Sequence, residues 1–224
     1  MMRTEEFIQL VIAQVQYHAA PDRAEGMKAY MRHQFAFAGL TQVQRGCVLK
    51  IILPAFRSLK PGDWEQAVRG LWALSTREYA YLAMELCRKV KSWHRPAHIG
   101  LFEEMILTHS WWDTVDFIAS NLVGELWGRY PQDKHKVMGR WMGSGNAWLQ
   151  RTCLIHQLKY REKTDAALLF SLCRELAAEQ DFFIRKAIGW ALRQFSKYDP
   201  IAVRAFLQST VLSPLSTREA SKYL

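Results

Sequence analysis

The most constraining feature of this sequence is a pattern of helical segments that recurs in pairs, with almost no strand signal. Four motifs place an aromatic residue or a leucine three positions ahead of a reference residue. They are Leu74-x-x-Arg77, Trp112-x-x-Val115, Trp148-x-x-Arg151 and Phe182-x-x-Arg185. The motifs lie 38, 36 and 34 residues apart, and each follows another helical segment of similar length. This period predicts an all-α, HEAT-like helical-repeat solenoid of about six antiparallel pairs, forming a single domain over residues 1–224.

Turn and capping residues support the helical prediction. Pro21 is suited to the first turn of a helix, and Thr41 and Asn146 are suited to helix N-caps. Ser75 followed by Glu78 has the spacing of a capping box. Further breaks are expected near residues 96, 110, 131, 143–146, 164–165, 180–181, 199–200 and 213–214. Together these boundaries predict about twelve or thirteen helices.

The charge of the chain indicates an anionic partner. Lys and Arg number 30 against 21 Asp and Glu, which gives a net charge of +9. Helical repeats would place Arg77, Arg151 and Arg185 at equivalent early positions, as a basic stripe along a concave groove. The stripe would continue through Lys159, Arg161, Lys186 and Arg193. A solvated surface position is the alternative for any one arginine, but a basic track interleaved with some of the nine tryptophans suits a phosphate backbone.

Several classes of protein are disfavoured. No run approaches the roughly 18 apolar residues of a membrane span, and the acidic start at residues 1–6 is unlike a signal peptide. We therefore expect a cytoplasmic protein, associated with the nucleoid if its partner is DNA. The cysteines at positions 47, 87, 153 and 173 form no C-x-x-C pair, so we expect reduced, packed thiols. The seven histidines lack ligand spacing, and we expect neither a metal nor a cofactor.

The segment Ser110–Asp116 is the first candidate for chemistry. On a helix, Trp112 and Asp116 share one face at i, i+4 spacing. Asp113 and Asp116 also lie near the start of that helix, where the helix dipole favours carboxylates. The alternative is that Asp113 caps the helix while Trp111 and Trp112 pack in the core.

Two further segments add aromatic and basic side chains. In Phe182–Trp190, Lys186 and Trp190 are i, i+4 neighbours, and Gly189 indicates close helix packing or a close ligand. In Asn146–Thr152, the capping asparagine would place Arg151 in the second helical turn.

Together these segments resemble the AlkD-type DNA alkylation repair family, the HEAT-like alkylpurine DNA glycosylases. The resemblance covers nearly the whole chain through separate motifs in the same order. These are residues 27–31, 77–79, 110–116, 148–151, 182–193 and 215–220. The chain departs from the family pattern after Tyr30, where it reads Thr41-Gln42-Val43-Gln44-Arg45-Gly46 instead of Thr-Pro followed by arginines.

The resemblance implies a monofunctional glycosylase that hydrolyses the N-glycosidic bond of cationic N3- or N7-alkylated purines in duplex DNA, without base flipping. It assigns the catalytic aspartate to Asp116, the active-site tryptophans to Trp112 and Trp190, and the phosphate-holding arginine to Arg151. The DNA-binding residues that we expect are Tyr30, Arg45, Arg77, Lys159, Arg161, Arg185 and Lys186. We expect a monomer, and the alternative function is a non-catalytic HEAT-like scaffold for DNA or a protein.

The nine tryptophans are expected to divide by role. Trp112 and Trp190 would face DNA, whereas Trp111 could take either role. The remaining six would pack between helices; they are Trp64, Trp72, Trp93, Trp127, Trp141 and Trp148.

Overall fold

The computed structural model describes residues 2–224 and is all-helical, as predicted. Within these residues no strand forms, and the pairing of Ala36 with Thr76 is an isolated β-bridge. The chain forms two compact units, the first ending at Trp93 and the second spanning His94–Leu224. No helix in residues 2–224 is long and apolar enough to cross a membrane.

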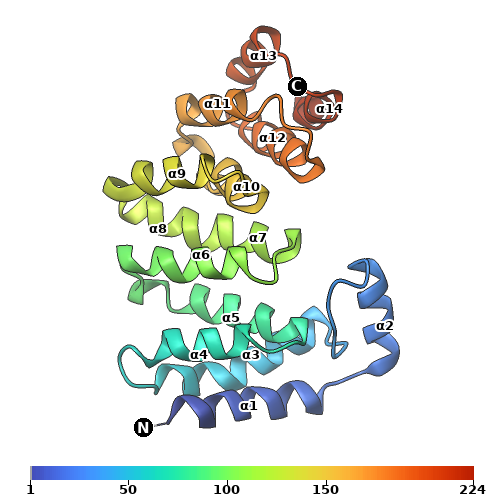
Figure 1. The fold of residues 1–224 in the computed structure, drawn as a ribbon, viewed down its shortest axis with the longest axis vertical. Coiled ribbons are helices and arrows are strands. Elements are labelled where there is room, and N and C mark those ends of the chain that lie inside the picture. Colours follow the sequence, from blue (N-terminus) through green and yellow to red (C-terminus); the bar gives the residue numbers. More distant parts are fainter. Residues whose placement is uncertain (1) are drawn as a thin grey trace. The chain divides into compact units, whose positions relative to one another are not determined.

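The first unit is a stack of helices around an apolar core. Phe7, Ile52, Phe56 and Leu71 are completely buried between them. Figure 1 shows α1, α3, α4 and α5 side by side, with α2 standing apart. The elements are α1 (Thr4–Tyr17), α2 (Pro21–Tyr30), α3 (Gln42–Arg57), α4 (Asp63–Trp72), α5 (Arg77–Lys89) and the 3₁₀ helix η1 (Lys91–Trp93).

Helix α2 is held in place at its ends rather than by its own packing. Ala24 is the one residue of α2 that is buried. Beyond α2, the buried Glu78 carboxylate accepts hydrogen bonds from the backbone N–H groups of Ala38, Gly39 and Leu40, at 2.8–3.0 Å. The predicted Ser75–Glu78 capping box is therefore wrong, because Thr76 is the N-cap residue and Glu78 binds the loop after α2 instead.

The second unit continues the pairing of helices. Its first elements are η2 (Pro96–His98), α6 (Ile99–Leu107), α7 (Trp112–Ile118), η3 (Ala119–Val123), α8 (Gly124–Arg129), η4 (Pro131–Asp133) and α9 (Lys134–Met142). They are followed by α10 (Ala147–Ile155), η5 (Arg161–Lys163), α11 (Ala166–Glu175), α12 (Phe182–Phe195), α13 (Pro200–Ser209), α14 (Pro214–Ala220) and η6 (Ser221–Tyr223). The segments η2, η4, η5 and η6 are 3₁₀ turns, and η3 is a π-helix.

Side-chain caps begin most of the later helices of this unit. Each capping oxygen accepts a hydrogen bond from a backbone N–H group in the first turn, which would otherwise lack a partner inside the helix. The capping residues are Asn146, Asp165, Asp181, Asp199 and Ser213. The predicted caps at Thr41 and Asn146, and the predicted helix start at Pro21, are confirmed.

The segments α7, η3 and α8 form one continuous helix with a π turn in its middle. Gly124, just after the π turn, packs directly on the C-cap residue of α10: a Cβ atom there would lie 2.2 Å from the carbonyl oxygen of His156. The Tyr160 hydroxyl donates to the Gly124 carbonyl oxygen at 2.6 Å. Burial lowers the pKa of His156 to about 4, so this imidazole is neutral at pH 7. These contacts fix the helix that positions Trp112 and Asp116.

The predicted register of the repeats is correct for three motifs and wrong for one. Trp112 and Phe182 are the first residues of α7 and α12, and Trp148 is the second residue of α10. Leu74, in contrast, precedes α5, and Arg77 is the first residue of that helix. Arg77 is therefore not equivalent to Arg151 and Arg185, which lie a turn further into their helices.

Most apolar packing predictions are confirmed. Trp64, Trp72, Trp127 and Trp141 are buried, and Trp93 stacks on Phe56. The cysteines at positions 87, 153 and 173 are buried free thiols. Cys47 is an exception, since it lies on an exposed position of α3.

Candidate active site

The centre of the candidate site is an ion pair between two adjacent helices. The Arg151 guanidinium, on α10, binds the Asp116 carboxylate, on α7, through two hydrogen bonds. Nε donates to Oδ1 at 2.7 Å and Nη2 donates to Oδ2 at 2.8 Å. The third nitrogen, Nη1, donates to the carbonyl oxygen of Phe183 on α12. Arg151 thereby connects α7, α10 and α12, each the second helix of a repeat pair, around the Asp116 carboxylate.

The Asp116 carboxylate lies in a largely dry environment. Its side chain is 17 % exposed and that of Arg151 is 5 % exposed. Burial raises the pKa of Asp116, and the charge of Asp113 adds to this, while the hydrogen bonds and charge of Arg151 oppose it. Burial also means that few water molecules screen the negative charge, which makes the carboxylate a strong electrostatic partner for a nearby cation.

The two tryptophans that the resemblance assigned to the site are half-buried. Trp112 precedes Asp116 by one helical turn, so both residues lie on the same side of α7. Trp190 follows Phe183 by two turns of α12, so the two residues lie on the same side of that helix. The carbonyl oxygen of Phe183 accepts the hydrogen bond from Arg151. Asp113 lies in the first turn of α7, and the N-cap residue is Trp111, so the alternative role of Asp113 as the N-cap is wrong.

An aromatic cluster borders the ion pair. The ring centroids of Trp111 and Trp148 lie 6.0 Å apart, and the Phe183 ring lies 5.3 Å from Trp111 and 4.8 Å from Trp148. The prediction that Trp148 packs between helices is confirmed, and Trp111, which the sequence left undecided, packs with it. The cluster joins the starts of α7, α10 and α12, and so fixes the spacing of the helices that hold Asp116 and Arg151.

Between α12 and α14, one carboxylate binds three cationic side chains. Glu219, on α14, accepts from Lys186 at 2.9 Å, from Arg193 at 2.8 Å and from Lys222 at 2.9 Å. The hydrogen bonds and charges of Lys186 and Lys222 lower the pKa of Glu219 to about 2. Lys186 and Arg193 precede and follow Trp190 by one turn, so the Glu219 network sets the surroundings of that tryptophan.

Gly189 explains how α14 comes so close to α12. A Cβ atom at this position would lie 2.5 Å from the Cβ atom of Glu219 and 2.8 Å from the carbonyl oxygen of Ser216. Of the two sequence-based explanations for Gly189, the structure therefore supports close helix packing.

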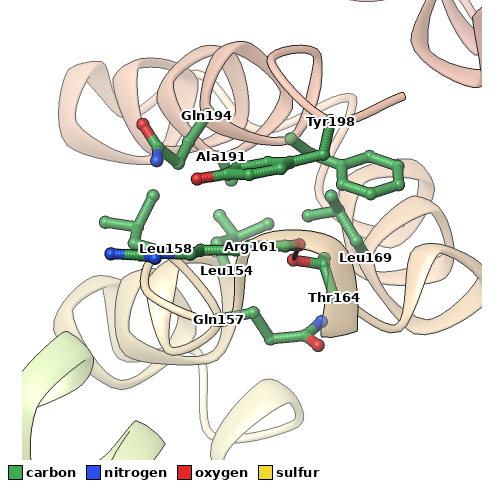
Figure 2. A pocket seen from close by; sticks show the side chains of 10 residues that line it. Leu154, Gln157, Leu158, Arg161, Thr164, Leu169, Ala191, Gln194 and Tyr198 are labelled. Atoms are coloured by element: carbon green, nitrogen blue, oxygen red, sulfur yellow. Dashed lines mark hydrogen bonds between the residues drawn. The ribbon is translucent and has the colours of Figure 1, made fainter. Parts of the chain in front are cut away.

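The remaining basic residues expected to bind DNA in this unit have different surroundings. Arg185 turns back to the loop before α12 and donates to the Glu179 carbonyl oxygen at 3.0 Å and to the Gln180 side chain. Lys159 donates to Asn121 of η3. Arg161 lines a narrow cavity of about 10 Å³ between α10 and α12, opposite Gln194 and Tyr198 (Figure 2). That volume fits about one water molecule and no larger ligand.

The expected DNA-binding residues of the first unit lie among aromatic rings. The Arg77 side chain is buried, with its guanidinium 3.7 Å from the centroid of the Phe35 ring. The Arg45 guanidinium lies 4.8 Å from the centroid of the Tyr81 ring. Tyr30, at the end of α2, is 73 % exposed.

Sequence reasoning missed Glu78 and Glu219 as organising residues. Both are buried acids whose partners are distant in the sequence: Glu78 binds backbone at positions 38–40, and Glu219 binds Lys186 and Arg193. The spacing of Glu219 and Lys222, at i, i+3, was the one local signal. Within residues 2–224, no group of three or more His, Cys, Asp or Glu side chains could hold a metal ion.

Comparisons with known proteins show the family and the fold of the chain. The family model described as DNA alkylation repair enzyme matches residues 11–224. A solved structure described as a predicted DNA alkylation repair enzyme from Enterococcus faecalis shares 33 % sequence identity. The match covers 92 % of this chain and 97 % of that one, with a TM-score of 0.86. No curated protein matches the sequence.

Proposed function

The chain belongs to the DNA alkylation repair enzyme family, and within that family we propose that it is a monofunctional DNA glycosylase. Its substrates are N3- and N7-alkylated purines in duplex DNA, and its product is an abasic site. The observation that supports this proposal best is the buried Asp116 carboxylate, held by two hydrogen bonds from Arg151. Both units act together as one enzyme, which works as a monomer in the cytoplasm, on the nucleoid.

The charge of the substrate explains why a carboxylate is suited to this reaction. Alkylation at N3 or N7 makes the purine cationic, so its C1′–N bond breaks without prior protonation of the base. The bonding electron pair leaves with the base, which becomes neutral, and positive charge develops on the sugar. Water then adds its oxygen to C1′ and releases a proton. A fixed anion beside the sugar lowers the energy of this transition state.

Asp116 is the catalytic residue in this mechanism. Its carboxylate stabilises the positive charge on the sugar and orients the attacking water. Because the side chain is mostly shielded from solvent, its charge acts with little screening. Its remaining exposure of 17 % suits a sugar that approaches while the damaged base stays in the stack, without base flipping.

Trp112 and Trp190 contact the deoxyribose and the cationic base. Both tryptophans are half-buried, so part of each side chain remains open to a ligand. A cation above an indole face is attracted by the negative potential of the ring. The tryptophans therefore favour the alkylated, cationic purine over an undamaged, neutral one.

The contacts of Arg151 define its role more narrowly than the resemblance did. Two of its nitrogens bind Asp116 and the third binds the Phe183 carbonyl oxygen. We therefore assign Arg151 first as a positioning residue that orients the Asp116 carboxylate. Contact with a DNA phosphate is secondary and uses the remaining N–H groups of the guanidinium.

We also propose DNA contacts outside the catalytic site. These contacts depend on the charge and exposure of the side chains rather than on a fixed geometry. Lys159, Arg161, Arg185 and Lys186 in the second unit, and Tyr30, Arg45 and Arg77 in the first, contribute to binding. Arg77 does so by supporting the aromatic side chains, since its own side chain is only 2 % exposed.

The proposal is tested by the release of 7-methylguanine from methylated duplex DNA. Asp116→Asn keeps the size of the side chain and removes its charge, and we expect the rate to fall by about 100-fold or more. Binding to the same duplex should change little. A variant as active as the parent would show that Asp116 has no catalytic role. No release by the parent protein would favour the non-catalytic scaffold.

A further inference from the structure

An open cavity of about 450 Å³ lies in the first unit, away from Asp116 along the chain. Helix α2 forms one wall through Met27 and Tyr30, and Phe37 lies in the loop that follows. Arg45, from the start of α3, and Tyr81, from α5, complete the cavity. The volume is within the range of pockets that bind small organic ligands.

The interior of the cavity is lined by aromatic rings. The ring centroids of Phe37 and Tyr81 lie 6.5 Å apart at an interplanar angle of 46°. The Arg45 guanidinium lies on the Tyr81 ring and also donates to the Leu40 carbonyl oxygen at 3.0 Å. Tyr30 stands at the exposed edge. Flat rings of this kind can stack on another flat ring.

The charged side chains of the cavity favour an anion. Arg23 and Arg45 contribute two positive charges against the single carboxylate of Asp22. Arg23 donates to the Gln44 side chain at 2.7 Å, which holds its guanidinium near the start of α3. A suitable ligand therefore combines a planar ring with a nearby negative charge.

We propose that this cavity binds one unpaired nucleotide of DNA. Its base packs against the ring of Tyr81, and its phosphate is held by Arg45 and Arg23. A base within an intact duplex presents only its edge, whereas an unpaired base can present its face. The inference rests on the proposed function only in taking DNA as the partner.

The loop beside the cavity is held in shape before any ligand binds. Glu78 accepts three hydrogen bonds from backbone positions 38–40. Gly39 has a φ of +88°, and a Cβ atom there would lie 2.2 Å from the carbonyl oxygen of Ala20. The loop therefore needs glycine at this point, and its fixed shape lowers the entropy cost of binding.

The test uses the full chain and two undamaged duplexes, identical except that one contains a single-nucleotide bulge of 2-aminopurine. We expect the bulged duplex to bind about 10-fold more tightly, with quenched fluorescence of the stacked 2-aminopurine. Tyr81→Leu, which removes the ring and keeps an apolar side chain, should abolish both effects. The matched control is Tyr17→Leu, since Tyr17 is 82 % exposed on α1 and outside the cavity.

Equal binding of the two duplexes would overturn the inference, and so would a preference for the bulge that survives Tyr81→Leu. Release of 7-methylguanine, measured on the same preparations, separates this inference from the proposed function. If 7-methylguanine is released but the bulged duplex is not preferred, the nucleotide-binding cavity is refuted and the proposed glycosylase activity is supported. A preference for the bulge without release supports the cavity and refutes the glycosylase.

Discussion

The two units use their arginines differently at the proposed sites. In the first unit, Arg45 and Arg77 lie on aromatic rings. In the second, Arg151 and Arg193 are bound to the carboxylates of Asp116 and Glu219. A ring holds a guanidinium without neutralising its charge, whereas a carboxylate neutralises the charge and fixes its geometry.

This difference suggests a division of tasks. The charge of Arg45, which lies on the Tyr81 ring, is available to a phosphate group, so the first unit is suited to binding. Arg151 orients the carboxylate of Asp116, the proposed catalytic residue, so the second unit is suited to the reaction. Substitutions of Arg45 and Arg151 should therefore affect different measurements.

The largest effect is expected for Arg151→Met, which removes the partner of Asp116. The rate of base release should fall by about 100-fold because the carboxylate loses its orientation. Arg151 lowers the pKa of Asp116, so its loss should move the acid limb of the pH–rate profile to higher pH. Base release needs the ionised carboxylate, and activity should therefore be lost as pH falls through this raised pKa.

The control for Arg151→Met addresses folding. An unpaired carboxylate in a mostly buried position lowers the stability of the protein, so a lower melting temperature is expected as well. The double variant Arg151→Met/Asp116→Asn should regain much of that stability but no activity. A second variant, Arg151→Lys, keeps the positive charge that Arg151→Met removes. If neither variant changed the pH–rate profile, the positioning role of Arg151 would be contradicted.

The next effect concerns the packing of α14 on α12. Gly189→Ala should lower the free energy of unfolding by about 1–3 kcal/mol, because the added Cβ atom meets Glu219 and the backbone of Ser216. Gly139→Ala, in α9, is the matched control, since no atom lies within 4 Å of its added Cβ. That control should gain up to about 1 kcal/mol from helix propensity. Equal effects in urea unfolding would show that α12 and α14 are not tightly packed.

A smaller effect is expected for DNA binding by the first unit. Arg45→Met should weaken binding to a bulged duplex several-fold and reduce the slope of log K against log salt by about one. Arg151→Met should leave this slope nearly unchanged, because the guanidinium is already paired with Asp116. A salt titration of both variants measures the comparison directly, and the reverse result would reject the division of tasks.

The smallest effect concerns acid stability. The pKa of Glu219 is about 2 in the folded protein, well below its ordinary value of 4.5. Its ion pairs therefore contribute stability that is complete above about pH 4.5 and is lost as pH falls towards 2. In Glu219→Gln this part of the pH dependence should disappear. The melting temperatures of both proteins are measured between pH 5 and pH 2. A parallel decline in the two would contradict a stabilising role for the Glu219 ion pairs.

Sequence patterns predicted much of the fold because helix starts are local. Thr41, Asn146 and Pro21 act through groups within the next turn, so a short window of sequence contains the whole interaction. The assignment of Trp112 and Asp116 to one helix face also needed only their spacing. These predictions depend on the geometry of a single helix.

Other interactions could not be predicted, because they join distant positions. Glu78 has the spacing of a local cap, yet it binds a loop about 40 positions earlier. Arg77 shares a motif with Arg151, but its helix begins three residues later than the motif indicates. In both cases a tertiary contact with the segment around Ala36 outweighs the local preference.

The π turn at Ala119–Val123 has a consequence for how this protein tolerates change in length. A π turn accommodates one more residue than the α-helix around it, and each residue of an α-helix turns the chain by about 100°. Deleting one residue from η3 would leave a regular helix in which Asp116 keeps its direction relative to Gly124, whereas deleting one residue of α7 after Asp116 would rotate Asp116 by about 100° relative to Gly124. The π turn is therefore the place where this helix can lose one residue without turning the Asp116 carboxylate away from its partners.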